Sequence, residues 1–160
     1  DDFYKETIGG RLEPVRKAVE IIRDSKKWYE IVALLVPGLN DDPDGVKGMC
    51  RWIRETCGAD VPLHFTRFRP EYKLKRLPMT PVAALEAAHK AARDAGLNYV
   101  YLGNLPGHEA GHTHCPKCGK KVVERLQFKV LSSAVDRGAC RPCGGMIAGV
   151  WDPDLKEAKP

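Results

Sequence analysis

Two rhythms of hydrophobic positions take turns along the first 105 or so residues of the chain. Segments whose apolar side chains recur every three or four positions predict helices, and each is followed by a short, nearly continuous apolar segment that predicts a strand. The expected helices cover about residues 13–24, 42–58 and 80–96, and the expected strands cover about residues 28–36, 63–68 and 99–102. This order predicts parallel strands joined by right-handed crossovers.

The second helix has the clearest boundaries. Asp42 can cap its first turn, Pro43 suits the first helical position and Gly58 can end it. Its apolar stripe consists of Val46, Met49, Cys50, Ile53 and Cys57, and the stripe of the first helix consists of Leu12, Val15, Val19 and Ile22. The first strand is apolar almost throughout, which is typical of a parallel strand that is buried on both faces.

These elements predict an α/β fold that is only part of a larger one. A parallel sheet of three strands has two unprotected edges, and the pattern begins with a helix instead of a strand. Both features favour a partial (β/α) parallel barrel of about three β/α units, cut open partway round. We expect this part over residues 1–106, a linker over 107–111, a small β-rich zinc ribbon over 112–151 and a polar tail over 152–160.

The composition is typical of a folded domain and not of a membrane-spanning segment. Hydrophobic residues make up 43% of the chain, enough for a real core, and no apolar run reaches the ~18–20 residues of a membrane span. No signal peptide is visible and the chain does not begin with Met, which suggests that these residues do not open the natural reading frame. The net charge of +5 is concentrated between Arg67 and Arg76, so a nucleic-acid partner is not required.

Four of the six cysteines form two C-x-x-C pairs, Cys115 with Cys118 and Cys140 with Cys143. Each pair is followed by glycine, which tolerates the positive φ of a metal-binding turn. Two such turns can bring four thiolates around one ion, and thiolates favour zinc over harder cations. We therefore predict a structural zinc ion, in a ribbon with strands near residues 121–125, 127–131 and 146–151.

Other interpretations of the cysteines stay open. A rubredoxin-type iron site uses the same four ligands, and a redox dithiol needs only one pair. His112 or His114 could replace a cysteine as a ligand. Cys50 and Cys57, seven residues apart in a helical pattern, would lie roughly 10 Å apart, too far for a disulfide, and are expected to be buried. Such cysteine usage favours a reducing, cytoplasmic setting.

The remaining histidines are weaker candidates for a site. His64 lies on the second expected strand, where it can either face a site or form a hydrogen bond within the core. His89 lies on the third expected helix and is expected at the surface.

Three ordered segments resemble a known family. They are LLVPGLNDD at residues 34–42, HFTRFRPEY at 64–72 and YVYLGNLPG at 99–107, the last of which leads into the C-x-x-C ribbon. This series is similar to radical S-adenosylmethionine (SAM) enzymes of the AmmeMemoRadiSam system, which are related to the pyruvate formate-lyase activating enzyme. The resemblance implies a barrel that cleaves SAM reductively and abstracts hydrogen from a substrate with the resulting radical.

The resemblance also implies a place for SAM, at the carboxyl ends of the strands. The residues expected there, in contact with SAM, are Val36, Pro37, Gly38, Phe68, Arg69 and Asn104. Related enzymes often carry histidine where Arg69 stands, although arginine can pair with a carboxylate. The alternative is that Val36 and Phe68 are core residues, Pro37 and Gly38 only form a turn, and the basic loop is only solvated.

One motif of the family is absent. Radical SAM enzymes hold a [4Fe–4S] cluster with C-x-x-x-C-x-x-C in the first β/α unit, and no cysteines of this chain have that spacing. The chain is therefore expected to be inactive alone, with the missing N-terminal half of the barrel as its partner and an unknown substrate, possibly a protein. The alternative is a stand-alone zinc-ribbon module that binds protein or nucleic acid. Nucleic acid is less favoured, because the ribbon has modest charge and few aromatic residues.

Overall fold

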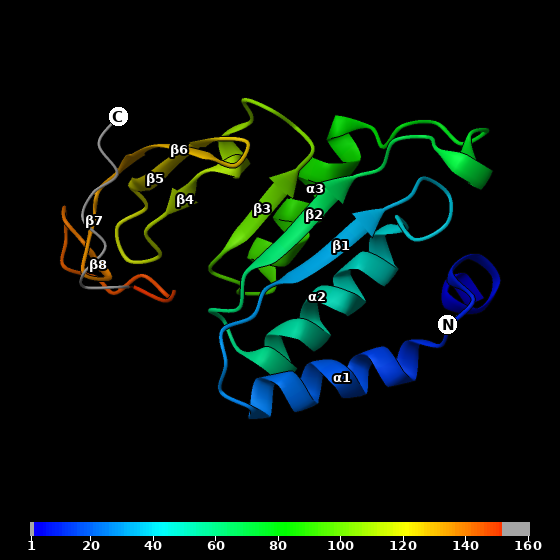
Figure 1. Cartoon of the computed structure of the whole chain (residues 1–160), viewed down its shortest axis with the longest axis horizontal. Coiled ribbons are helices and arrows are strands. Elements are labelled where there is room, and N and C mark those ends of the chain that lie inside the picture. The colour runs from blue at the N-terminus through cyan, green and yellow to red at the C-terminus, as the bar shows by residue number, and fades with distance from the viewer. Residues whose placement is uncertain (1, 152–160) are drawn as a thin grey trace.

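A computed structural model describes residues 2–151 of the chain. Three parallel strands form the centre of the larger of its two parts. The strands are β1 (Ile31–Leu35), β2 (Leu63–Arg67) and β3 (Val100–Gly103), paired in the order β1-β2-β3. The α-helices are α1 (Leu12–Asp24), α2 (Pro43–Cys57) and α3 (Val82–Asp94). Figure 1 shows α2 and α3 along one face of the sheet and α1 beside α2. The predicted alternation of helices and parallel strands is confirmed.

The start and the end of α2 follow from its sequence. The Asp42 side chain accepts a hydrogen bond from the backbone N–H of Gly45 at 2.9 Å, and Pro43 occupies the first helical position. At the other end Gly58 has a φ of +90°, which side chains with a Cβ rarely adopt. The predicted boundaries of this helix are confirmed.

The core lies between the sheet and the helices α2 and α3. Leu35, Leu63 and Phe65 point from the strands into it and are at most 1% exposed. The helical side chains that meet them are Val46, Cys50, Ile53, Leu85, Ala88 and Ala92. Since each fully buried Leu or Phe side chain contributes about 1.5–3 kcal/mol, burial in this layer stabilises the sheet.

The opposite face of the sheet is open, which corrects the expectation that β1 is buried on both faces. Val32 is 67% exposed and Leu34 is 44% exposed. The side chains of this face form two rows across the paired strands, Val32–His64–Tyr101 and Leu34–Thr66–Gly103. No helix of the described residues covers these rows.

The first helix also differs from its prediction. None of its residues is buried, and Val15 and Ile22 are 42% and 43% exposed, although they belong to the expected apolar stripe. The helix is held at its ends instead, by Arg16 over the ring of Trp52 and by a hydrogen bond from Arg23 to the carbonyl of Thr56. A π-helical turn, η1 (Phe3–Ile8), precedes it and was not expected.

The second part of the molecule is a set of short antiparallel strands beside β3 (Figure 1). These strands are β4 (Thr113–His114), β5 (Lys121–Leu126), β6 (Lys129–Ser133), β7 (Val135–Asp136) and β8 (Ala139–Cys140). They form one sheet in the order β4-β5-β6 and a second of β7 and β8. The prediction of a small β-rich unit is confirmed.

Details of that unit correct the sequence analysis. The expected strand at 127–131 begins at Lys129, because Gln127 has a φ of +53° and forms the hairpin turn. The expected strand at 146–151 is wrong: only Met146 pairs, in a single bridge with Ala139. There the Trp151 indole donates to the carbonyl of Ile147, which bends the chain instead of extending it.

The connecting segments contain short helices as well. The expected linker at 107–111 includes the 3₁₀ turn η3 (Glu109–Gly111), and the segment after β2 includes η2 (Tyr72–Leu74). Among the described residues, no helix combines the length and the apolar character that crossing a membrane requires. The expected polar tail at 152–160 lies outside the described residues.

Candidate metal centre

The two C-x-x-C segments form a matched pair of tight turns. In the first, the N–H of Gly119 donates to the carbonyl of Cys115 at 2.8 Å, and in the second the N–H of Gly144 donates to the carbonyl of Cys140 at 2.7 Å. Both glycines have a positive φ, +71° and +69°. The predicted need for glycine at these two positions is confirmed.

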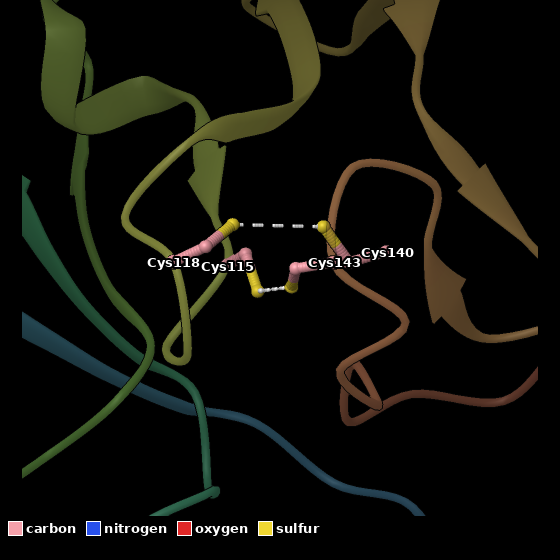
Figure 2. Close-up of side chains that lie close together, drawn as sticks. All are labelled: Cys115, Cys118, Cys140 and Cys143. Carbon is pink, nitrogen blue, oxygen red and sulfur yellow. Dashed lines mark hydrogen bonds between the residues drawn. The ribbon is translucent and has the colours of Figure 1, made fainter.

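The four sulfur atoms converge on one point between these turns. Figure 2 shows Cys115 facing Cys143 and Cys118 facing Cys140, with Sγ–Sγ distances of 3.6 and 3.8 Å. All four sulfurs lie within 4.8 Å of one another. Four thiolates at ~2.3 Å from a tetrahedral zinc ion would be about 3.8 Å apart, so the arrangement fits such an ion. These cysteines can therefore hold one metal ion.

The surroundings of the sulfurs differ from turn to turn. Burial opposes ionisation of Cys115, but the backbone N–H groups of Cys118 and Lys117, together with the neighbouring thiols, lower its pKa to about 7. At Cys140, burial and the adjacent thiols raise the pKa to about 12. A bound cation would favour the thiolate form at every position, because metals bind deprotonated sulfur.

Side chains from the parallel sheet fix the position of the metal centre. Tyr99, 4% exposed, belongs to a small cluster with Cys115, Cys140, Val122 and Ile147. The hydroxyl of Tyr99 accepts a hydrogen bond from the N–H of Ala148 at 2.9 Å. The ribbon is therefore packed against the edge of β3.

A second set of contacts joins the ribbon to β3 nearer the middle of the strand. The hydroxyl groups of Tyr101 and Thr113 lie 3.0 Å apart, and Arg125 donates to the Thr113 hydroxyl at 2.7 Å. The Arg125 guanidinium also lies 6.0 Å from the centre of the Tyr101 ring.

The histidines before the first turn do not join the metal ligands. His112 Nδ1 accepts a hydrogen bond from the N–H of Arg125 at 3.1 Å, and His114 Nε2 lies 3.0 Å from a carboxylate oxygen of Glu109. Among the described residues, the group that could hold a metal consists of the four cysteines alone. Sequence reasoning favoured this outcome, because four cysteines already complete the site.

Two further histidines, His64 and His89, lie on opposite faces of the sheet. His64 stacks on the ring of Tyr101 with centroids 4.9 Å apart, and its Nε2 lies 2.7 Å from a carboxylate oxygen of Glu30. His89 was expected at the surface, but it is half-buried against β3, and that burial lowers its pKa. The expectation failed because the apolar stripe of α3 is wide enough to include this position.

The residues expected near SAM all follow the carboxyl ends of the three parallel strands. Val36, Pro37 and Gly38 follow β1, Phe68 and Arg69 follow β2, and Asn104 follows β3. Their exposure to solvent differs.

Two of these side chains are buried and the others are not. Val36 and Phe68 are 2% and 6% exposed, and their backbone N–H groups already donate to the side chains of Asn40 and Thr80. Gly38, Arg69 and Asn104 are exposed, and the Asn104 side chain donates to the carbonyl of Arg67 at 3.2 Å. An open, polar set therefore remains at this edge of the sheet.

Thr80 is a structural residue that sequence reasoning missed. The sequence predicts that the third helix begins at about residue 80, yet α3 begins at Val82 and the fully buried Thr80 hydroxyl does not cap it. It donates instead to the carbonyl of Leu35 at 2.6 Å and accepts from the N–H of Phe68 at 2.9 Å. Thr80 thus joins the ends of β1 and β2, and no spacing in the sequence signals this role.

The two remaining cysteines belong to α2. Cys50 is fully buried, as predicted, and burial raises its pKa to about 11. Cys57 is half-buried at the end of the same helix. Neither lies in a loop with two other cysteines, so the cysteines of this chain do not provide the three ligands that a [4Fe–4S] cluster of this family needs.

Comparison with known proteins gives one informative relative. The chain matches no protein-family model. It is 40% identical, over 148 residues, to a protein of Methanocaldococcus jannaschii that carries the name "Uncharacterized protein MJ0808". That alignment covers 91% of this chain but 44% of the relative, so the chain spans less than half the length of the protein that it matches.

Proposed function

We propose that this chain is the C-terminal part of a radical SAM enzyme, in which a structural zinc ion holds the ribbon against the last strand of a barrel. The observation that carries the proposal is the one-sided sheet: helices on one face, an open face of half-exposed side chains on the other. The ordered resemblance of the three strand-and-loop segments supplies the chemistry.

The strand order supports a barrel over an open doubly wound sheet. Right-handed crossovers between strands paired in the order β1-β2-β3 put every connecting helix on the same side. A doubly wound sheet reverses its order and has helices on both faces, whereas a barrel has helices only outside. The rows Val32–His64–Tyr101 and Leu34–Thr66–Gly103 would then be layers of the barrel interior.

The two edges of the sheet also support this assignment. The ribbon packs along β3 through Tyr99 and Tyr101, whereas no strand within residues 2–151 pairs with the outer edge of β1. An exposed strand edge is a template for pairing with a further strand. The missing N-terminal half of the barrel would attach here, and the greater length of the Methanocaldococcus jannaschii relative leaves room for such a half.

In the intact enzyme, the carboxyl edge of the sheet would receive SAM. Gly38, Arg69 and Asn104 are the exposed members of the set at this edge, and the Arg69 guanidinium could pair with the carboxylate of SAM. The cluster and SAM together would supply a 5′-deoxyadenosyl radical for hydrogen abstraction. No ligand set for the cluster exists on this chain, so the chain alone is proposed to be inactive.

For the four cysteines we propose zinc in a purely structural role. Four protein ligands leave no open position for a substrate, and sulfur ligands with this geometry suit zinc. Free cysteines and thiolate ligands persist in a reducing compartment, so a cytoplasmic setting belongs to the proposal. Metal analysis of protein purified without added metal tests it: about one equivalent of zinc is expected, and iron in its place would contradict it.

The enzyme proposal has its own experiment. The coding sequence upstream of Asp1 is expected to encode C-x-x-x-C-x-x-C in frame. The full-length protein, reconstituted with iron and sulfide under reducing conditions, is then expected to release 5′-deoxyadenosine from SAM. Arg69→Ala should weaken SAM binding in that protein, with Arg141→Ala as a control on the ribbon. An in-frame start codon near Asp1 with no upstream cluster motif would refute the proposal.

A second candidate function, a protein-binding zinc ribbon, rests on the hairpin of β5 and β6. Phe128 at its tip is fully exposed, and all five residues of β6 are exposed on an edge strand. Exposed apolar residues that cluster in this way mark interaction sites. Co-purification of a partner that is lost with Phe128→Ser, from a chain lacking any upstream cluster motif, would favour this candidate.

A further inference from the structure

The segment between β2 and α3 carries most of the net charge of the chain. Residues 69–76, which we name the basic loop, contain four basic side chains and one acidic one, Glu71. The four cations are Arg69, Lys73, Lys75 and Arg76, and all are exposed. Within residues 2–151, no ion pair is found for any of the four, whereas lysines elsewhere pair with Asp44, Asp94 and Glu109.

The base of the basic loop is held firmly. The backbone N–H of Thr80 donates to the carbonyl of Phe68 at 3.3 Å, and the Thr80 hydroxyl accepts the N–H of Phe68 in return. The Arg67 guanidinium donates to the carbonyl of Thr80 at 2.8 Å. The loop therefore leaves and rejoins the fold at one fixed point, which limits the entropy that a partner would have to remove.

Tyr72 gives the basic loop an apolar centre. Its φ of +50° is an unusual conformation for a bulky residue, and its side chain is 79% exposed. The Lys73 ammonium lies 5.4 Å from the centre of the Tyr72 ring. Backbone strain of this kind is concentrated at functional sites, and tyrosine is enriched at protein interfaces.

We propose that the basic loop is a docking surface for an acidic segment of a partner protein. Unneutralised cations around one exposed aromatic ring complement carboxylates next to an apolar side chain. A nucleic acid is disfavoured, because binding a single strand uses several stacking aromatics along a charged groove and this loop offers one.

The position of the basic loop in the fold indicates where a bound partner would lie. The basic loop follows β2 and so lies at the carboxyl edge of the sheet. In the loop after β1, the carboxylates of Asp41 and Asp42 accept hydrogen bonds from the backbone N–H groups of Gly38 and Gly45. If the proposed function holds, the acidic partner reaches the mouth of the barrel. The docking claim itself rests on charge and exposure alone and does not require SAM chemistry.

Fluorescence anisotropy with a labelled peptide of about ten glutamates and one tyrosine tests the proposal on the 160-residue chain at low salt. The variant Arg69→Gln/Lys73→Gln/Lys75→Gln/Arg76→Gln is expected to bind about tenfold more weakly, which corresponds to ~1.4 kcal/mol. Glu71→Gln, which raises the charge of the loop, is expected to bind about twofold more tightly, a gain that misfolding cannot produce.

The matched control removes the same charge from other places. It combines Lys27→Gln, Arg51→Gln, Lys120→Gln and Lys129→Gln, all at exposed positions. This control is expected to change affinity less than about twofold. Equal losses in both quadruple variants, or tighter binding of a DNA strand of similar charge than of the acidic peptide, would overturn the proposal. SAM cleavage by the full-length protein is measured separately, so failure of one claim leaves the other standing.

Discussion

The parallel sheet and the ribbon are stabilised by different means. Thirteen buried residues, mostly aliphatic or aromatic, form the cluster between the sheet and its helices. The cluster of the ribbon contains five buried residues, of which two are cysteines and one, Tyr99, immediately precedes β3. A unit of about 40 residues with so small a core usually needs a metal ion or disulfides. We therefore expect the sheet to fold through burial and the ribbon to depend on a metal ion held by its four cysteines.

The two parts also differ in how complete they are within the described residues. The ribbon is complete in its ligands, because its four sulfurs already satisfy one tetrahedral ion. Within residues 2–151 the sheet has a core on its helix-covered face, an open opposite face and no strand paired with the outer edge of β1. Within residues 2–151 the ribbon therefore contains all the ligands of its candidate site, whereas the sheet has one face that no further layer covers.

Removal of the metal is expected to have the largest effect, and to be confined to the ribbon. Structural zinc contributes roughly 10–16 kcal/mol of apparent binding free energy in small zinc domains, which is more than the ribbon core can replace. Cys115→Ser/Cys140→Ser should therefore unfold the ribbon. Hydrogen exchange should then become fast at the amides of β5 and β8 while the amides of α2 and α3 stay protected.

A matched cysteine variant controls for loss of a thiol as such. Cys57→Ser lies outside the metal centre and should leave both the metal content and the exchange pattern of the ribbon unchanged. If the double variant exposed α2 and α3 as well, the sheet would depend on the ribbon and the contrast drawn above would be lost.

A core truncation in the sheet is expected to have the next largest effect. Phe65 is fully buried, so Phe65→Ala should lower the free energy of unfolding by about 3–5 kcal/mol. Phe128→Ala makes the same chemical change at a fully exposed position of the ribbon and should alter it by less than about 0.5 kcal/mol. Urea unfolding followed by circular dichroism compares the two. A metal content unchanged by Phe65→Ala would confirm that the two parts are stabilised separately.

The sequence predicted the helices and strands of the sheet well, because local signals coincide there with the tertiary structure. Asp42, Pro43 and Gly58 bound α2 in the structure as they do in the sequence. The spacing of the cysteines similarly predicted that their four sulfurs come together, since a C-x-x-C-G turn forms from its own residues.

Features that depend on what surrounds an element could not be predicted in this way. Apolar residues in β1 indicated burial on both faces, yet burial of Val32 and Leu34 requires a second layer that residues 2–151 do not supply. The role of Thr80 depends on the meeting of two strand ends that are distant in sequence. The barrel itself remains a proposal for the same reason.

A hydrogen-bond variant at Thr80 is expected to have an intermediate effect. Thr80→Val keeps the volume but leaves the N–H of Phe68 and the carbonyl of Leu35 without their buried partner, at a cost of about 1–3 kcal/mol. Thr80→Ser keeps the hydroxyl and serves as the control. Hydrogen exchange should increase in residues 69–79 for the valine variant alone, and equal exchange in both variants would contradict the role of the hydroxyl.

The smallest expected effect is a pH dependence that belongs to the sheet and not to the ribbon. Burial of His89 on α3, with the nearby Arg93 charge adding to it, lowers its pKa below the ordinary value of 6.5. The unfolded chain therefore binds more protons than the folded one at acid pH. The stability that neutral His89 supports is complete above about pH 6.5 and is lost as the pH falls through the folded-state pKa. Acid also releases metal from thiolates, in wild type and variant alike.

His89→Gln separates these two effects. Urea unfolding of α3 is measured at about pH 7 and at about pH 5.5. The free energy of unfolding should fall more in the wild-type protein than in the variant. The difference between the two decreases should be less than about 1.4 kcal/mol per pH unit. Metal content measured on the same samples reports the ribbon, and it should fall equally in both proteins. If both lost the same stability in α3, His89 would titrate as it does in the unfolded chain, and the acid sensitivity of the molecule would lie in its metal centre alone.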